Sequence, residues 1–114
     1  MEAIEIKAGD SCLLVNCHGE VTIEVSGEMK RRIEESLQAE TFESLVLDLS
    51  QVRFMDSSGI GALVALNSKV KSAGKRFYLL APSEQVRKTL ELVQLLSFFD
   101  IMDSKEDLEL LLPE

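Results

Sequence analysis

Three short polar residues, Asp56, Ser57 and Ser58, stand between two apolar segments of this 114-residue sequence. The segment that ends at Met55 is strand-like, whereas the segment after the polar residues has the spacing of a helix. The backbone N–H groups in the first turn of a helix lack partners inside the helix, and oxygen-bearing side chains can supply them. Ser57 is a good N-cap residue, so helix capping alone is one interpretation of the three residues.

A second interpretation gives the junction a function. Open sheets of parallel strands usually carry their sites at the carboxyl ends of the strands, which is where we expect Asp56 and Ser57. A cap needs one side chain, but here three polar residues stand beside two glycines, Gly59 and Gly61. Because the N-terminus of a helix stabilises negative charge, a hydroxyl group there is well placed to receive a phosphate.

Among enzymes, a serine hydrolase is the first class that these serines could indicate. Its nucleophile elbow has the pattern G-x-S-x-G, whereas the sequence reads M-D-S-S-G around Ser57 and D-S-S-G-I around Ser58. The one histidine, His18, ends an early predicted strand. The pattern therefore disfavours a catalytic triad.

Phosphate-binding loops and phospho-aspartate sites also fit poorly. The sequence lacks the G-x-x-x-x-G-K-[ST] pattern of a P-loop. A phosphorylated Asp56 would need neighbouring acids to bind magnesium, but Asp48 lies inside the preceding predicted strand and Asp10 belongs to a turn. We expect neither site, and we expect no cofactor or metal of the chain's own.

The composition limits the kinds of partner. The formal net charge is −8, from 12 basic and 20 acidic residues. Nucleic acids and anionic membrane surfaces attract clustered Lys and Arg, so we expect neither as a partner. A protein partner with a basic face would suit this charge.

The cysteines and the absence of long apolar runs indicate a reduced, cytoplasmic protein. Cys12 and Cys17 lie five residues apart in a strand-like run, so their side chains should point to opposite faces without forming a disulfide. No N-terminal segment has the pattern of a signal peptide. No apolar run approaches the ~20 residues that span a bilayer.

Hydrophobic periodicity predicts the elements that position the junction. We predict strands over residues 4–7, 12–17, 45–49, 77–80 and 98–102. We predict helices that begin near Gly27 (capped by Ser26), Ser57, Pro82 and Ser104. Strands that alternate with helices predict an α/β fold: one domain over residues 1–114, with a mixed, mostly parallel central sheet of about four to five strands and about four helices.

The segment around the junction resembles the signature of the STAS-domain family, specifically that of its anti-sigma-factor antagonists. The shared residues are Val46-Leu47-Asp48-Leu49-Ser50, Val52, Phe54-Met55-Asp56-Ser57-Ser58-Gly59-Ile60-Gly61 and Leu63. The resemblance extends to a glycine-acid turn at Gly19-Glu20, to Gly74-Lys75 with Phe77-Tyr78-Leu79, and to Phe98-Phe99-Asp100-Ile101.

The resemblance implies a switch protein rather than an enzyme. Members bind an anti-sigma factor that is also a serine kinase, and the binding frees the sigma factor to activate transcription. The kinase uses ATP to phosphorylate the first serine after the aspartate, which here is Ser57, and a PP2C-type phosphatase reverses the step. Apart from the resemblance, the sequence has no strong additional apolar stripe, so we expect a monomer. The partner-binding residues would be Glu20, Thr22, Asp56, Ser57, Ser58, Gly59, Ile60 and Gly61.

One position departs from the pattern of the resembled family. Members often have an aspartate where this sequence has Thr22, in a G-E-[LI]-D pattern that begins at Gly19. Thr22 can be a partner contact or simply a turn residue, and Glu20 is open to the same two interpretations. Two alternatives to the switch remain: a scaffold subunit of a larger signalling complex that is never phosphorylated, and the small serine hydrolase considered above.

Overall fold

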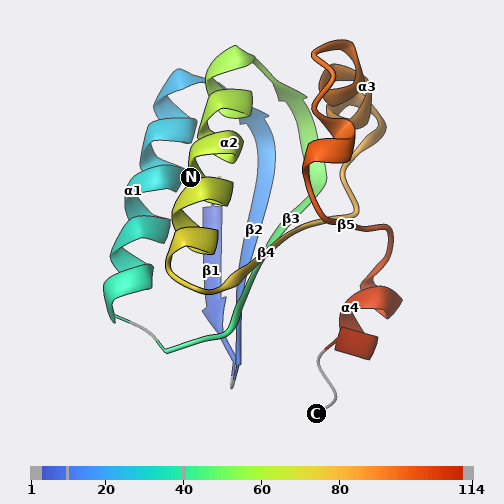
Figure 1. Ribbon diagram of the computed structural model, residues 1–114. Coiled ribbons are helices and arrows are strands. Elements are labelled where there is room, and N and C mark those ends of the chain that lie inside the picture. Colours follow the sequence, from blue (N-terminus) through green and yellow to red (C-terminus); the bar gives the residue numbers. More distant parts are fainter. Residues whose placement is uncertain (1–3, 10, 40, 112–114) are drawn as a thin grey trace.

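The computed structural model describes residues 4–9, 11–39 and 41–111, and its elements alternate between strands and helices (Figure 1). In chain order they are β1 (Ile4–Ala8), β2 (Cys12–Val21), α1 (Ile23–Ala39), β3 (Ser44–Met55), α2 (Ser57–Ser72), β4 (Arg76–Leu80), α3 (Glu84–Leu92), the 3₁₀ helix η1 (Leu96–Phe98), β5 (Ile101–Met102) and α4 (Lys105–Leu111). The element order is the predicted one, with η1 added.

One five-stranded sheet has the order β1-β2-β3-β4-β5. The short connection between β1 and β2 makes this pair antiparallel, and every following pair is parallel. The carboxyl ends of β2 and β3 therefore meet at one end of the sheet, where α1 and α2 begin (Figure 1). The predicted mixed, mostly parallel α/β fold is confirmed.

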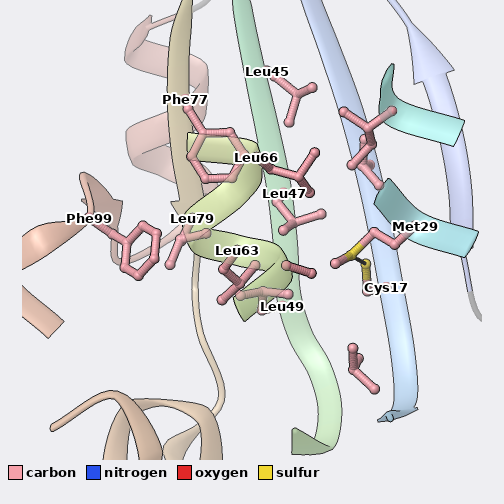
Figure 2. Close-up of a cluster of buried hydrophobic side chains, with 14 of the residues drawn as sticks. Cys17, Met29, Leu45, Leu47, Leu49, Leu63, Leu66, Phe77, Leu79 and Phe99 are labelled. Atoms are coloured by element: carbon pink, nitrogen blue, oxygen red, sulfur yellow. Dashed lines mark hydrogen bonds between the residues drawn. The ribbon is translucent and has the colours of Figure 1, made fainter. Parts of the chain in front are cut away.

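Helices α1 and α2 lie side by side against one face of the sheet (Figure 1). Alternate residues of β3 point to this face, and Figure 2 shows Leu45, Leu47 and Leu49 beside Leu66 of α2 and Met29 of α1. All five side chains are fully buried. Their burial removes apolar surface from water, and it fixes the start of α2 relative to the sheet.

The opposite face of the sheet carries a smaller apolar cluster. It contains Cys12, Val46, Leu80 and Met102, with Leu108 of α4 packed against it. Cys17 belongs instead to the main core, where its Sγ atom lies 3.6 Å from Sδ of Met29. The two cysteines lie on opposite faces of the sheet, as predicted. Burial raises the pKa of the Cys17 thiol to about 12, so this group is unreactive at neutral pH.

Strand β2 continues past its predicted end at Cys17. The pairing register with β3 shifts between Asn16 and His18 and again between Gly19 and Glu20, and Gly19 has a φ of 86°. These irregularities bend the strand without ending it. The predicted turn at Gly19-Glu20 is therefore wrong, because both residues lie within the last part of β2.

Helix α1 begins earlier than predicted, and Ser26 is not its cap. The helix starts at Ile23, and the hydroxyl of Ser26 donates to the backbone oxygen of Ile23, 3.1 Å away, from inside the first turn. The last predicted strand is also shorter than expected. Phe98 lies in η1, and β5 contains only Ile101 and Met102.

Candidate functional site

Asp56 caps helix α2 at the end of β3. Its backbone is extended, with φ −92° and ψ −173°, and its Oδ1 atom accepts hydrogen bonds from the backbone N–H groups of Ser58 and Gly59. The donor–acceptor distances are 3.0 and 3.1 Å. The N-cap is thus Asp56. The prediction that Ser57 caps the helix is wrong. An aspartate is as good a cap as a serine, and its charge also suits the N-terminus of a helix.

The Asp56 carboxylate is held in its ionised form. The Ser58 hydroxyl donates to the same Oδ1 atom over 2.5 Å, and this bond is the largest cause that lowers the pKa of Asp56. Partial desolvation acts in the opposite direction, and the N–H groups of Gly59 and Ser58 lower the pKa further. A carboxylate that accepts several hydrogen bonds is a weak base.

The two serines at this junction differ in their surroundings. Ser57 is the first residue of α2 and is exposed, and its hydroxyl has no recorded hydrogen bond to any part of the chain that the structure describes. Ser58 is half-buried. Its hydroxyl donates to Asp56 and lies 3.3 Å from the Ser26 hydroxyl of α1. Of the two adjacent hydroxyl groups, the one on Ser57 is open to a partner.

The two glycines of the junction have different roles. A Cβ atom on Gly59 would lie 2.5 Å from Cγ of Met55 and 3.1 Å from the backbone oxygen of Val21, so the helix could not pack this close to the strands with a larger residue. A Cβ atom on Gly61 would meet nothing within 4 Å. Gly59 and Ile60 are buried, and Ile60 belongs to the main core.

The end of β2 lies directly beside the junction. Val21 pairs with Met55, and its backbone oxygen accepts a hydrogen bond from Asp56 N–H over 3.3 Å. Glu20 is exposed near the end of this strand, and Thr22 connects the strand to α1. The structure thus brings Glu20 and Thr22 to the end of the sheet where Asp56 and Ser57 lie.

A groove of about 300 Å³ lies between α1 and α2 beside the junction. It is lined by Ile23, Ser26, Gly27, Lys30, Ser58, Gly61 and Ala62. Ile23 at its mouth is 73% exposed, which is unusual for a large apolar side chain, and it was not among the predicted site residues. In the sequence, only the position of Ile23 directly after Thr22 indicated that it could belong to the site. The pattern of polar and apolar residues in α1 did not show which apolar residue faces solvent.

In the part of the chain that the structure describes, no hydrolytic site forms around Ser57. His18 lies three residues before Val21 in β2 and lines a different pocket, with Ile4, Glu5, Ile6 and Arg32. Asp48 is buried in β3, where its Oδ1 atom accepts from the N–H and hydroxyl groups of Ser50. Within the described ranges, no cluster of three or more His, Cys, Asp or Glu side chains could hold a metal ion.

Among the described helices, none is both long and apolar enough to cross a bilayer.

Comparison with known proteins assigns this architecture to a family. The sequence model of the STAS domain matches residues 3–108, which is nearly the whole chain. The chain belongs to the STAS domain family. The junction at Asp56-Ser57-Ser58 therefore lies at the strand–helix connection of a STAS domain, as the resemblance predicted.

Individual anti-sigma factor antagonists are similar to this chain over almost their full length. The anti-sigma F factor antagonist of Paenibacillus polymyxa is 26% identical over 102 residues, which cover 90% of this chain and 87% of that protein. The unphosphorylated form of the anti-sigma factor antagonist SpoIIAA superposes with a TM-score of 0.82 at 18% identity, with 98% of each chain covered. The phosphorylated form of SpoIIAA from Bacillus gives 0.77 at 20% identity, with 96% of this chain and 99% of that chain covered.

Proposed function

We propose that this STAS domain is an anti-sigma-factor antagonist whose binding to its partner is controlled by phosphorylation of Ser57. The partner is an anti-sigma factor with serine kinase activity, and the unphosphorylated antagonist binds it and releases the sigma factor. The observation that carries the proposal is the exposed hydroxyl of Ser57 at the first position of α2, with no recorded hydrogen bond to the described residues, next to Asp56, which caps the helix. The name of the Paenibacillus polymyxa relative supports the same role.

The fold can accept a phosphate at Ser57 without rearrangement. Asp56 already caps the N–H groups of Ser58 and Gly59, so no structural hydrogen bond has to break when Ser57 is modified. The positive end of the helix dipole lies at the same point and favours the added negative charge. That SpoIIAA has been solved in both forms agrees with a fold that keeps its shape on phosphorylation.

The same phosphate would oppose a partner that docks on this corner. It adds about −1.5 to −2 of charge at neutral pH. Asp56 is ionised beside it, so a closely packed interface would contain two repelling anionic groups. A loss of about 3 kcal/mol in binding free energy weakens affinity more than a hundredfold, which is enough for a switch.

The chain contributes the accepting hydroxyl and the docking surface, and the partners contribute the chemistry. The kinase brings ATP and its magnesium ion, and a PP2C-type phosphatase restores the Ser57 hydroxyl. The antagonist needs no cofactor of its own, is not an enzyme, and acts as a cytoplasmic monomer. The docking surface comprises the exposed parts of the Asp56-to-Gly61 corner together with Glu20 and Thr22.

Incubation with ATP-Mg and the candidate kinase tests the proposal. The intact protein should gain the mass of one phosphate, and peptide mapping should place it on Ser57. Ser57→Ala should gain almost none and should still bind the kinase. If the kinase modifies another substrate but leaves this chain unmodified, the protein is not its antagonist, and stable co-purification with other STAS chains would then indicate a scaffold subunit.

A further inference from the structure

Ser57 and Ser58 both have a hydroxyl group. Only the hydroxyl of Ser58 lies beside a recorded base, which would make Ser58 the better nucleophile. Its oxygen lies 2.5 Å from a carboxylate oxygen of Asp56, in the arrangement by which a base accepts a hydroxyl proton. Ser57 has no such recorded neighbour within the described residues. If Ser57 is the phosphate acceptor, as proposed, a feature other than sequence position keeps phosphate off Ser58.

The hydrogen bonds around Ser58 show how it is restrained. Its hydroxyl proton is directed at Asp56 Oδ1, which also accepts two backbone N–H groups and is therefore a poor base. The Ser58 oxygen can in turn accept a hydrogen bond from the hydroxyl of Ser26, which lies 3.3 Å away on α1. Donation and acceptance together fix the direction of the Ser58 hydroxyl.

Ser26 is buried, so its hydroxyl can form hydrogen bonds only with groups inside the protein. It is 4% exposed inside α1, and its hydroxyl lies 3.1 Å from the backbone oxygen of Ile23 and 3.3 Å from Ser58. A hydroxyl has one proton, so these two bonds alternate. Alanine would satisfy the packing of a helix interior, yet the chain has a polar residue there that reaches across to α2.

We propose that Ser26 is a positioning residue that holds the Ser58 hydroxyl on Asp56 and so confines phosphate transfer to Ser57. The inference rests on the proposed function. In the permitted reaction, the Ser57 oxygen bonds to the γ-phosphorus of ATP and the bond from that phosphorus to the β-phosphate oxygen breaks. ADP leaves, and the hydroxyl proton passes to a basic group of the kinase or to water.

The test measures which serine receives phosphate when Ser57 is removed. Ser57→Ala should take up almost no phosphate from ATP-Mg and the kinase. The double variant Ser57→Ala/Ser26→Ala should take up phosphate on Ser58, with an initial rate roughly five- to tenfold higher, the scale expected for one lost hydrogen bond. Ser57→Ala/Ser26→Thr keeps the hydroxyl group and should return the rate to that of Ser57→Ala.

A matched control separates positioning from a general loss of stability. Ile33 is fully buried on the same helix, and Ser57→Ala/Ile33→Val loosens the core without changing the hydroxyl groups. This control should take up phosphate on Ser58 no faster than Ser57→Ala does. The inference would be overturned if the Ile33 control modified Ser58 as fast as the Ser26→Ala double variant, or if that double variant were no faster than Ser57→Ala. Both outcomes require that wild-type Ser57 accepts phosphate. A wild-type chain that accepts no phosphate at all would contradict the proposed function and the inference together.

Discussion

At Ser57 the proposed switching role is separate from the structural roles of its neighbours. Asp56 caps the helix, Ser58 is held by Asp56 and Ser26, and Gly59 allows the helix to approach the strands. Ser57 contributes to none of these interactions. A charge added at Ser57 should therefore change binding far more than it changes stability.

Ser57→Asp tests this separation. The variant should unfold at the wild-type temperature, because an acid in the first turn of a helix is favourable. Its affinity for the anti-sigma factor should fall at least tenfold, since the charge is smaller than that of a phosphate. Ser68→Asp adds the same charge at an exposed position further along α2 and should bind normally. Calorimetric titration that gave equal affinities for both variants would contradict the switch.

Asp56→Ala tests the cap. The variant removes the acceptor of the Ser58 and Gly59 N–H groups, so its melting temperature should be lower than that of the wild type at neutral pH. The folded-state pKa of Asp56 is lowered from its usual 3.8, so its contribution is present above that value and is lost as the pH falls through the lowered pKa. The difference in melting temperature should therefore shrink in acid. If the difference in melting temperature stayed constant with pH, the loss of stability would not come from the Asp56 carboxylate.

At the scale of elements, the close packing of α2 against β2 and β3 requires a glycine at position 59 but not at position 61. Gly59→Ala places a Cβ atom against Met55 and the backbone of Val21, and should destabilise the fold by about 1–3 kcal/mol. Gly61→Ala points into open space within a helix and should stabilise it by about 0.5–1 kcal/mol. Urea unfolding of the two variants measures both effects. The same sign for both would show that the packing described here is wrong.

The sequence predicted the existence of these elements better than their ends. A strand over residues 45–49 and a strand-like segment that ends at Met55 were predicted separately, and pairing with β2 joins them into the single strand β3. The sequence could not decide between Asp56 and Ser57 as the cap, because both residue types cap helices well and the choice depends on where the strand ends. The exposure of Ile23 and the contact between Ser26 and Ser58 required knowledge of how α1 and α2 pack, which no local pattern contains.

At the scale of the whole molecule, the fold and the charge are both suited to docking on a protein. The parallel sheet brings Glu20 and Asp56 to the same end of the structure, and the chain carries a net charge of −8. A partner with a basic face would be attracted before contact is made. The alternating pattern of strands and helices made this architecture predictable, because few topologies satisfy right-handed parallel connections.

The association rate with the anti-sigma factor should therefore depend on salt. Raising the ionic strength from about 0.05 to about 0.3 M shortens the Debye length and should lower the association rate severalfold, with a smaller change in the dissociation rate. Stopped-flow mixing measures both rates. An association rate that did not change or that increased with salt would exclude electrostatic attraction between the partners.

The central claim is that phosphate on Ser57 controls partner binding, and one pair of affinities tests it most directly. The phosphorylated chain, with its modification mapped to Ser57, and the unmodified chain would be titrated into the same anti-sigma factor in a calorimeter. We predict that the unmodified chain binds more than about a hundredfold more tightly, which corresponds to roughly 3 kcal/mol. Equal affinities for the two forms would contradict the account.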